Sequence, residues 1–225
     1  MTEIVVAVAG QPNSGKSTLF NMLTGMRQFV ANYPGVTVEK RVGRMNYKGY
    51  KFMLVDLPGT YSMTSYSLEE RIARNFLLKE RPDIVLDVVD ASNLERNLVL
   101  TFQLLEMKIP MVVVLNMMDA AESARIKIDV NGLSEELGVK VVPTMAKRGV
   151  GKAELCDALL DTYQLAGDIN DFRLDYGPQL NRSLNVLQEA LADDERASAY
   201  DLRWLAVRLI AGDEEVSKLF TGSLA

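Results

Sequence analysis

The residues best suited to chemistry begin with a glycine-rich segment, GQPNSGKS, at residues 10–17. It fits the pattern G-x-x-x-x-G-K-[ST] and lies between an apolar run, Ile4–Ala9, and a segment of helical periodicity, Lys16–Thr24. In such a segment, backbone N–H groups and the helix N-terminus point at phosphate oxygens, a lysine adds positive charge, and a hydroxyl can bind magnesium. An ordinary glycine-rich turn is the alternative. We predict that the following residues bind nucleotide phosphates, with Ser17 as a magnesium ligand: Gly10, Asn13, Ser14, Gly15, Lys16, Ser17 and Thr18.

A carboxylate follows at the end of a second apolar run. The run Lys51–Asp56 continues as DLPG, so Asp56 and Gly59 lie about 40 residues after the glycine-rich segment. At the carboxyl end of a strand, Asp56 is placed to hold magnesium through water, and the Gly59 N–H to meet a γ-phosphate and sense its loss. A solvated turn aspartate is the alternative.

The sequence NMMD at residues 116–119 closes a third apolar run and predicts a base-binding site. A carboxylate accepts from both the N1–H and the 2-amino group of guanine, a pair that adenine does not offer. We therefore predict that Asn116, Met117 and Asp119 bind the base, with Asp119 selecting guanine and the apolar arm of Met117 covering the base face. Asp119 would also serve as a helix N-cap.

Two further loops complete the predicted site. Gly35, Val36 and Thr37 lie between the glycine-rich segment and Asp56, where a threonine can bind magnesium through its hydroxyl and the γ-phosphate through its N–H. A threonine before a strand is also an ordinary β-former. Met145, Ala146 and Lys147 follow the last apolar run, and the Ala146 N–H is predicted to meet the guanine O6. Small GTPases carry serine where this chain has Met145, so relaxed base selectivity is expected; an ordinary loop is the alternative.

The elements that position these residues predict an α/β fold with a mixed, mostly parallel, six-stranded sheet. Only five residues separate the second and third strands, which therefore form an antiparallel hairpin. The predicted strands are Ile4–Ala9, Val38–Met45, Lys51–Asp56, Ile84–Asp90, Met111–Asn116 and Val139–Pro143. The predicted helices are Lys16–Thr24, Leu68–Lys79, Asn97–Met107, Val130–Leu137 and Gly151–Tyr163.

The last part of the chain predicts a small all-α subdomain. Apolar residues recur at helical spacing in Leu180–Leu191 and Ala199–Ile210, and a third short helix is expected after Gly212-Asp213. We therefore divide the chain into residues 1–166 and 167–225. About 50 residues bury little core by themselves, so this subdomain must pack against the first domain or a partner, with Trp204 directed inward.

Composition excludes several classes of function. The 225 residues include one cysteine and no histidine, which rules out internal disulfides, His-dependent catalytic triads and zinc sites with His ligands. No run approaches the ~18 apolar residues of a membrane-spanning helix, and the apolar start is too short for a signal peptide. The net charge of −5 arises wholly in residues 167–225, with 6 basic and 11 acidic side chains, so nucleic acid is not an expected partner.

These loops, in this order, resemble a translation-factor-class GTPase of the small Ras-like, phosphate-loop fold. Four stretches indicate one family within this class: residues 10–21 (GQPNSGKSTLFN), 33–39 (YPGVTVE), 56–62 (DLPGTYS) and 88–98 (VVDASNLERNL). They are closely similar to the N-terminal cytoplasmic domain of the bacterial ferrous-iron transporter family FeoB. The resemblance covers essentially the whole chain, because that family follows its G domain with a helical subdomain resembling a GDP-dissociation inhibitor.

The resemblance implies GTP binding and slow, potassium-stimulated hydrolysis that regulates ferrous-iron uptake. It implies Mg²⁺ and K⁺ as cofactors, with Asn13 helping to hold potassium, and Asn13, Lys16, Thr37 and Gly59 as catalytic residues. Thr60 stands where Ras-type enzymes have a water-positioning glutamine. Implied partners are GTP and GDP, a polytopic membrane region of the full-length transporter, and small accessory proteins of iron uptake. The implied location is the cytoplasmic face of the bacterial inner membrane.

Two other functions remain open from the sequence. A ribosome-assembly or tRNA-modification GTPase shares the asparagine-containing phosphate loop but usually carries a basic RNA-binding module, whereas residues 167–225 are acidic. The second alternative is a switch that binds nucleotide but does not hydrolyse it at a useful rate. Phosphate release in sodium and in potassium separates such a switch from an enzyme.

Overall fold

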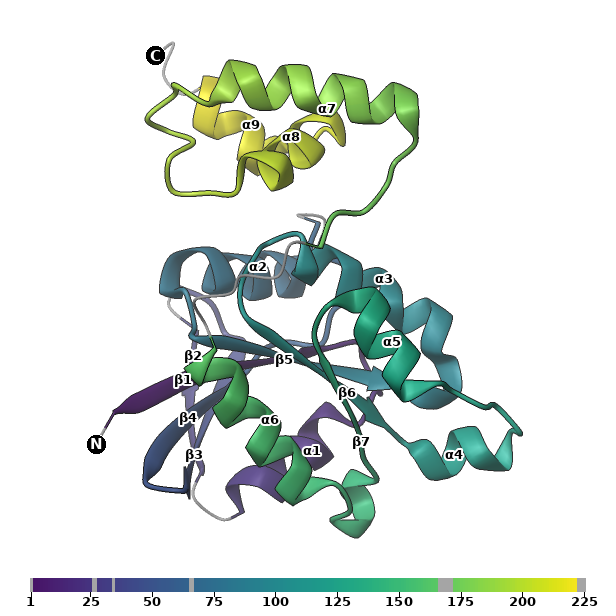
Figure 1. The fold of residues 1–225 in the computed structure, drawn as a ribbon. Coiled ribbons are helices and arrows are strands. Elements are labelled where there is room, and N and C mark those ends of the chain that lie inside the picture. The colour runs from purple at the N-terminus through teal and green to yellow at the C-terminus, as the bar shows by residue number, and fades with distance from the viewer. Residues whose placement is uncertain (1, 26–27, 34, 65–66, 166–171, 222–225) are drawn as a thin grey trace.

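The computed structural model describes residues 2–25, 28–33, 35–64, 67–165 and 172–221. They form one mixed sheet with helices on both faces and a helical subdomain stacked on one side (Figure 1). The strands are β1 (Glu3–Gly10), β2 (Gln28–Asn32), β3 (Glu39–Tyr47), β4 (Tyr50–Asp56), β5 (Ile84–Asp90), β6 (Met111–Asn116) and β7 (Lys140–Pro143). The α-helices are α1 (Lys16–Thr24), α2 (Leu68–Glu80), α3 (Leu94–Leu105), α4 (Met118–Ser123), α5 (Val130–Leu137), α6 (Lys152–Gln164), α7 (Pro178–Leu191), α8 (Leu202–Ile210) and α9 (Glu214–Thr221).

The sheet has the order β2-β3-β4-β1-β5-β6-β7. Strand β1 pairs in parallel with β4 and β5, and β5, β6 and β7 continue the parallel part. The central strands are almost wholly buried because helices cover both faces, which explains their continuous Val, Ile, Leu and Ala composition. The predicted fold class is confirmed.

The predicted count of six strands was wrong by one edge strand. Strand β2 pairs only with β3, and its five residues read QFVAN, too short and too polar at both ends to stand out as a strand. Phe29 and Val30 are 62% and 55% exposed, because an edge strand with one neighbour buries little of its apolar surface. The short helix α4 was also not predicted, since its six residues show barely two turns of periodicity.

The predicted antiparallel hairpin is confirmed between β3 and β4, where Tyr47 lies opposite Tyr50. The two turn residues, Lys48 and Gly49, have φ values of 44° and 84°. Two positive φ values in a two-residue loop match the right-handed twist of the flanking strands. The hairpin carries β4 back alongside β1, which brings Asp56 to the edge where β1 ends.

Two hydrophobic clusters lie on opposite faces of the sheet. Helices α2, α3 and α5 pack on one face, and α1 and α6 on the other (Figure 1). The first cluster extends into the helical subdomain through Leu191, Trp204, Leu205 and Val216. The subdomain therefore shares a core with the layer formed by α2 and α3.

The helical subdomain packs as its amphipathic pattern requires. Trp204 is 1% exposed, and Tyr200 stacks on it with ring centroids 6.0 Å apart. Helix α7 begins at Pro178, directly after Gly177, as expected for proline at a first helical position. The predicted boundary between residues 166 and 167 lies outside the described residues. Among those that are described, no helix is long and apolar enough to cross a bilayer.

Candidate nucleotide-binding site

The predicted site loops meet at one edge of the sheet. Strands β1, β4 and β6 run parallel within it and end at Gly10, Asp56 and Asn116. Parallel strands place their carboxyl ends together, which is where α/β proteins bind ligands. The loop after β7 joins the same edge, because Thr144 donates from its backbone N–H to the Leu115 carbonyl at 2.7 Å.

The glycine-rich loop has a tightly defined backbone. Asn13 and Gly15 have φ values of 68° and 85°, and the Ser14 N–H donates to the Gln11 carbonyl at 3.2 Å. A Cβ at Gly15 would collide with the Asn116 side chain, so glycine is required there. Helix α1 begins directly after Gly15, and its first-turn residues Ser17 and Thr18 are exposed. The loop therefore presents a helix N-terminus and its hydroxyls to solvent.

Lys16 and Asp56 form an ion pair across this edge. Their side chains are only 11% and 9% exposed, so each neutralises the charge of the other in a largely dehydrated place. The contact shows that the Asp56 carboxylate reaches the phosphate loop. Among the described residues, no group of three or more acidic, Cys or His side chains is arranged to hold a metal ion.

The segment after Asp56 rests on the phosphate loop. The Thr60 N–H donates to the Gly10 carbonyl at 3.3 Å, and Gly59 lies so close to Pro12 that a Cβ would be 3.3 Å from its backbone. Thr60 is 3% exposed. Any movement of Gly59 would therefore also change the contacts between this segment and the glycine-rich loop.

Thr37 is not brought into contact with the phosphate loop. It lies in a turn closed by the Tyr33 N–H, which donates to the Val38 carbonyl at 2.9 Å, and its exposed side chain bonds to no described residue. The turn is nonetheless tied to Asp56, whose backbone carbonyl accepts a hydrogen bond from the Tyr33 hydroxyl at 3.0 Å. Burial, and secondarily the charge of Asp56, raises the pKa of the Tyr33 phenol, so this hydroxyl stays protonated and donates. Gly35 and Val36 belong to the same turn, in which the Val36 N–H donates to the Tyr33 carbonyl.

Asn116 joins three loops at the predicted base site. Its Nδ2 donates to the Ser14 carbonyl at 3.0 Å, and its Oδ1 accepts from the Thr144 hydroxyl at 3.2 Å and from the Ala146 N–H at 3.1 Å. The role of Asn116 is thus to hold the phosphate loop against the loop after β7. The Ala146 N–H, predicted to meet the base, donates within the protein here.

Asp119 is half-buried and faces Arg148. The Arg148 Nε lies 3.7 Å from one Asp119 carboxylate oxygen, and the other accepts from the Ala120 N–H at 3.1 Å. Met117, with φ of 60°, precedes α4 and sits beside Gly15. Met145 pairs with Val150 across a short turn, while Lys147 is exposed. The structure thus gathers most of the predicted base-site residues and adds Arg148, which no sequence motif indicated.

Gln11 and Arg96 were also missed as parts of the site. The buried Gln11 side chain donates to the Arg96 carbonyl at 2.6 Å, and the Arg96 guanidinium lies 4.6 Å from the centre of the Tyr61 ring. Asn97 holds the start of α3 by accepting from the Asp90 N–H and donating to the Asn93 carbonyl. The stretch at residues 88–98, noted for its resemblance alone, was the signal. Its Asn97 fixes the start of α3, and its Arg96 carbonyl accepts the hydrogen bond from the glycine-rich loop.

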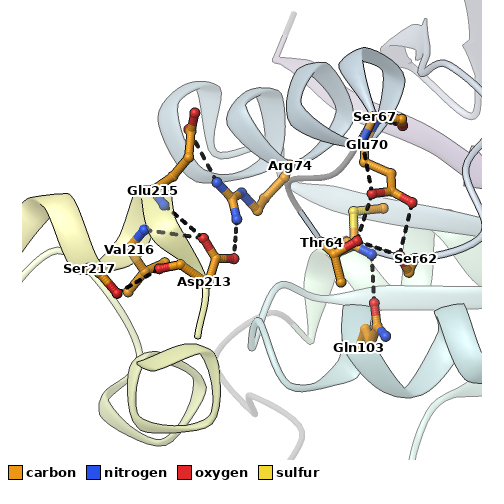
Figure 2. Close-up of polar contacts among 11 residues, drawn as sticks. Ser62, Thr64, Ser67, Glu70, Arg74, Gln103, Asp213, Glu215, Val216 and Ser217 are labelled. Carbon is orange, nitrogen blue, oxygen red and sulfur yellow. Dashed lines mark hydrogen bonds and ion pairs between the residues drawn. The ribbon is translucent and has the colours of Figure 1, made fainter. Parts of the chain in front are cut away.

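A polar network connects the segment after Gly59 to α2, as Figure 2 shows. Ser67 and Glu70 form a capping box at the start of α2, and Glu70 also accepts from the Ser62 and Thr64 hydroxyls at 3.0 and 2.6 Å. One turn further along the same helix, Arg74 binds residues of the helical subdomain. Helix α2 thus touches the site segment at one end and the subdomain along its side.

Comparison with known protein families identifies the family to which this chain belongs. The family model described as "Ferrous iron transport protein B" matches residues 4–159. The chain belongs to the FeoB family. A second model, the "FeoB cytosolic helical domain", matches residues 176–224, which contain α7, α8 and α9.

Known relatives match all or nearly all of this FeoB chain. The Fe(2+) transporter FeoB of Salmonella typhimurium is 42% identical over 229 residues, covering 100% of this chain and 29% of the relative. A Porphyromonas gingivalis protein named as a fusion of Fe(2+) transport protein A and FeoB is 42% identical over 96% of this chain and 26% of its own. The T. maritima FeoB cytosolic domain in a GDP form has a TM-score of 0.94 at 38% identity, covering 100% of this chain and 88% of that one. The chain thus spans under a third of these two curated relatives.

Proposed function

We propose that this chain binds GTP and hydrolyses it slowly to GDP and phosphate, with stimulation by potassium, and so regulates ferrous-iron uptake. The observation that carries the proposal is the Lys16–Asp56 ion pair at the sheet edge. It brings the lysine of the phosphate loop and the predicted magnesium-binding carboxylate together, with Asn116 attached to the same loop. A nucleotide would exchange this internal pair for phosphate and magnesium.

The proposed phosphate site uses the loop amides, Lys16 and the hydroxyls of α1. Ser17 and Asp56 fit magnesium, Asp56 through water, because both lie at the loop and carry oxygen ligands. Thr37 would join them only after its turn moves toward the loop. Asn13 is exposed and its side chain bonds to no described residue, so its carboxamide oxygen is available to a potassium ion. When bound, the two ions would neutralise charge that develops on the phosphates.

Slow turnover follows from the residue at position 60. Thr60 is buried and its N–H is bonded to Gly10, and no histidine exists to act as a general base. The attacking water would then be held mainly by backbone groups near Thr37 and Gly59. Such positioning supplies less activation than a dedicated side chain, so potassium is expected to contribute a large share of the rate.

The proposed base selectivity rests on Asp119. Guanine would displace Arg148 from this carboxylate and pair with it through two N–H groups. Because the Ala146 N–H already donates to Asn116, binding the guanine O6 requires the loop Met145–Lys147 to shift. Relaxed selectivity against other bases remains part of the proposal.

The proposed setting is the cytoplasmic face of a bacterial inner membrane, next to the membrane region of the full-length transporter. We propose the division into residues 1–166 as the G domain and 167–225 as a subdomain resembling a GDP-dissociation inhibitor. The Porphyromonas gingivalis fusion supports a small accessory protein as a partner. The acidic composition of residues 167–225 argues against nucleic acid as a partner.

The test measures binding of GTP, GDP and ADP to the purified chain, and then phosphate release in potassium and sodium buffers of equal ionic strength. We expect both guanine nucleotides to bind more tightly than ADP, and hydrolysis to be faster in potassium. Equal rates in the two salts would remove the potassium role. Binding without phosphate release in either salt would support a switch that lacks useful catalysis.

A further inference from the structure

Arg208, in the last turn of α8, is a buried cation with no hydrogen-bond or ion-pair partner among the residues that the structure describes. The residue is 5% exposed, and its Nε has no hydrogen-bond acceptor. No ion pair or side-chain hydrogen bond joins its guanidinium to any residue in the described ranges. Burial lowers the pKa of Arg208, although the charges of Glu106 and Asp213 act in the opposite direction. A buried guanidinium in this state favours a bound anion, because nearby carboxylates offset its desolvation only in part and accept no hydrogen bond from it.

The buried Arg74 and the half-buried Arg203 show which contacts Arg208 lacks. Arg74 and Arg203 also have an unpartnered Nε. Arg74, however, pairs with two carboxylates through its terminal nitrogens, and Arg203 donates to the Leu174 carbonyl at 2.7 Å and to Asn181 at 3.2 Å. Arg208 is therefore distinguished by its terminal nitrogens, which have no protein acceptor in this part of the chain.

Arg208 lines a cavity of about 280 Å³ between the G domain and the helical subdomain. Thr64 and Arg71 contribute from the segment before α2 and from α2 itself, and Lys218 contributes from α9. The side chains of Arg71 and Lys218 are exposed at the cavity and, like that of Arg208, make no ion pair with a described residue. Three cations from three helices thus face one small space.

The carboxylates at the cavity do not cancel these cations. Asp213, Glu214 and Glu215 line the same space. Arg74 engages two of them, and the Asp213 carboxylate also accepts from the N–H groups of Glu215 and Val216 at 3.1 and 3.2 Å. Of these three carboxylates, only the exposed Glu214 is not engaged by Arg74. Glu106, whose charge also acts on Arg208, does not line the cavity and accepts a hydrogen bond from the Tyr176 hydroxyl at 2.7 Å, so the cavity favours an anion.

We propose that this cavity binds a small oxyanion of phosphate or sulfate size, held by Arg208 with Arg71 and Lys218 at the rim. A planar guanidinium offers two parallel N–H groups that match two oxygens of such an anion, and the two rim cations add charge. The bound anion would link α2 to α8 and α9. It would therefore stabilise the contact between the helix that follows the site segment and the helical subdomain.

The experiment measures thermal unfolding of the GDP-loaded protein while inorganic phosphate or sulfate is titrated to a few millimolar against sodium chloride of equal ionic strength. Wild type should show a saturable rise of a few degrees, as expected for a ligand that binds the folded state. Arg208→Met should lose the saturable part. The matched control is Arg182→Met on the exposed face of α7, which should respond as wild type does. Lys218→Met changes an exposed side chain and should weaken the apparent affinity severalfold, which keeps the test decisive if Arg208→Met does not fold.

Lys16→Ala separates this proposal from the nucleotide site. An anion that binds only in the phosphate loop would lose its effect in Lys16→Ala, and that result would overturn the proposed cavity site. A response retained in Lys16→Ala but absent in Arg208→Met would support it, whatever the protein does with GTP. An equal response of wild type, Arg208→Met and Arg182→Met would reflect general salt effects and would also overturn it. So would strong coupling between Arg208→Met and Glu106→Gln in a double-mutant cycle in chloride alone, because Arg208 would then already be paired with Glu106.

Discussion

The Asp213 carboxylate binds the Arg74 guanidinium of α2 and at the same time accepts the first N–H groups of α9 (Figure 2). Both side chains are nearly inaccessible, at 2% for Arg74 and 5% for Asp213. Glu215 adds a second contact to Arg74 at 3.2 Å. One carboxylate thus fixes the start of α9 to the helix that continues from the nucleotide-site segment.

Replacing Arg74 by methionine should destabilise the protein by about 3 kcal/mol or more, because Asp213 then stays buried without its counter-charge. Urea unfolding measures this loss. Lys79→Met, an exposed change on the same helix, should have little effect. We also expect faster GDP release from Arg74→Met, since α2 loses its attachment to the subdomain. A GDP release rate equal to that of Lys79→Met would show that this ion pair is structural only.

Lys16→Ala should abolish tight binding of nucleoside triphosphates, because the phosphate loop loses its cation and Asp56 loses its partner. Isothermal titration with GTP measures the affinity. The double variant Lys16→Ala with Asp56→Asn should regain stability over Lys16→Ala when no nucleotide is present, as the unpaired charge is removed. Near-wild-type GTP affinity of Lys16→Ala would contradict the assignment of the phosphate site.

The positions of the site loops could be predicted from the sequence because they depend on local rules. Strand, turn and helix alternate, and parallel strands place Gly10, Asp56 and Asn116 at one edge. Strand β2 was not predicted because it pairs with one neighbour only, and its side chains show little alternation of apolar and polar residues. The hairpin after it was predictable, since the short gap between strands allows no other connection.

The contacts within the site could not be predicted, because they join residues far apart in the chain. Nothing local indicates that Asp119 faces Arg148, or that Gln11 reaches the Arg96 carbonyl. The pairing of Lys16 with Asp56 likewise depends on how two loops close in space. Residue types at the right spacing thus predicted which residues bind the ligand, while their contacts within the protein required the fold.

Asp119→Asn should weaken GTP binding at least tenfold and favour xanthine nucleotides, because an amide can donate to the 2-oxo group of xanthine. Competition with a fluorescent guanine nucleotide compares GTP, ATP and XTP. Arg148→Gln should slow GDP release up to a few-fold, since an exposed cation no longer competes for Asp119. Wild-type protein that binds GTP and ATP equally would mean that Asp119 does not control selectivity.

Asp87 is the buried carboxylate whose titration should be visible in stability. It is 1% exposed on β5 and accepts one hydrogen bond from the Thr101 hydroxyl at 2.6 Å. Burial raises its pKa from 3.8 to about 6, and the bond from Thr101 acts the other way. The folded state therefore binds this proton more readily than the unfolded state. The contribution of Asp87 is most favourable below about pH 4, declines between pH 4 and 6, and is fully unfavourable above pH 6.

Asp87→Asn should consequently stabilise the protein at pH 7.5 by up to about 3 kcal/mol, with the gain shrinking as the pH falls toward 4. Thr101→Val should do the reverse, since it removes the donor that stabilises the ionised form. Its cost should be larger at pH 7.5 than at pH 5. Urea unfolding of both variants at several pH values provides the measurement. A gain for Asp87→Asn that is independent of pH would mean that Asp87 does not titrate in this range.

Asn13 offers the sharpest test of the potassium role, because its backbone and side chain can be separated by substitution. Its φ of 68° is tolerated by asparagine and glycine but strained for alanine. Asn13→Gly should therefore keep the loop conformation and GTP affinity while losing the carboxamide ligand, so that hydrolysis becomes equally slow in potassium and sodium. Asn13→Ala should lose the same stimulation and bind GTP somewhat more weakly, owing to backbone strain of about 1 kcal/mol. Phosphate release in the two salts, with GTP affinity measured alongside, distinguishes the two effects. If Asn13→Gly is still stimulated by potassium as strongly as wild type, the ion is held without Asn13.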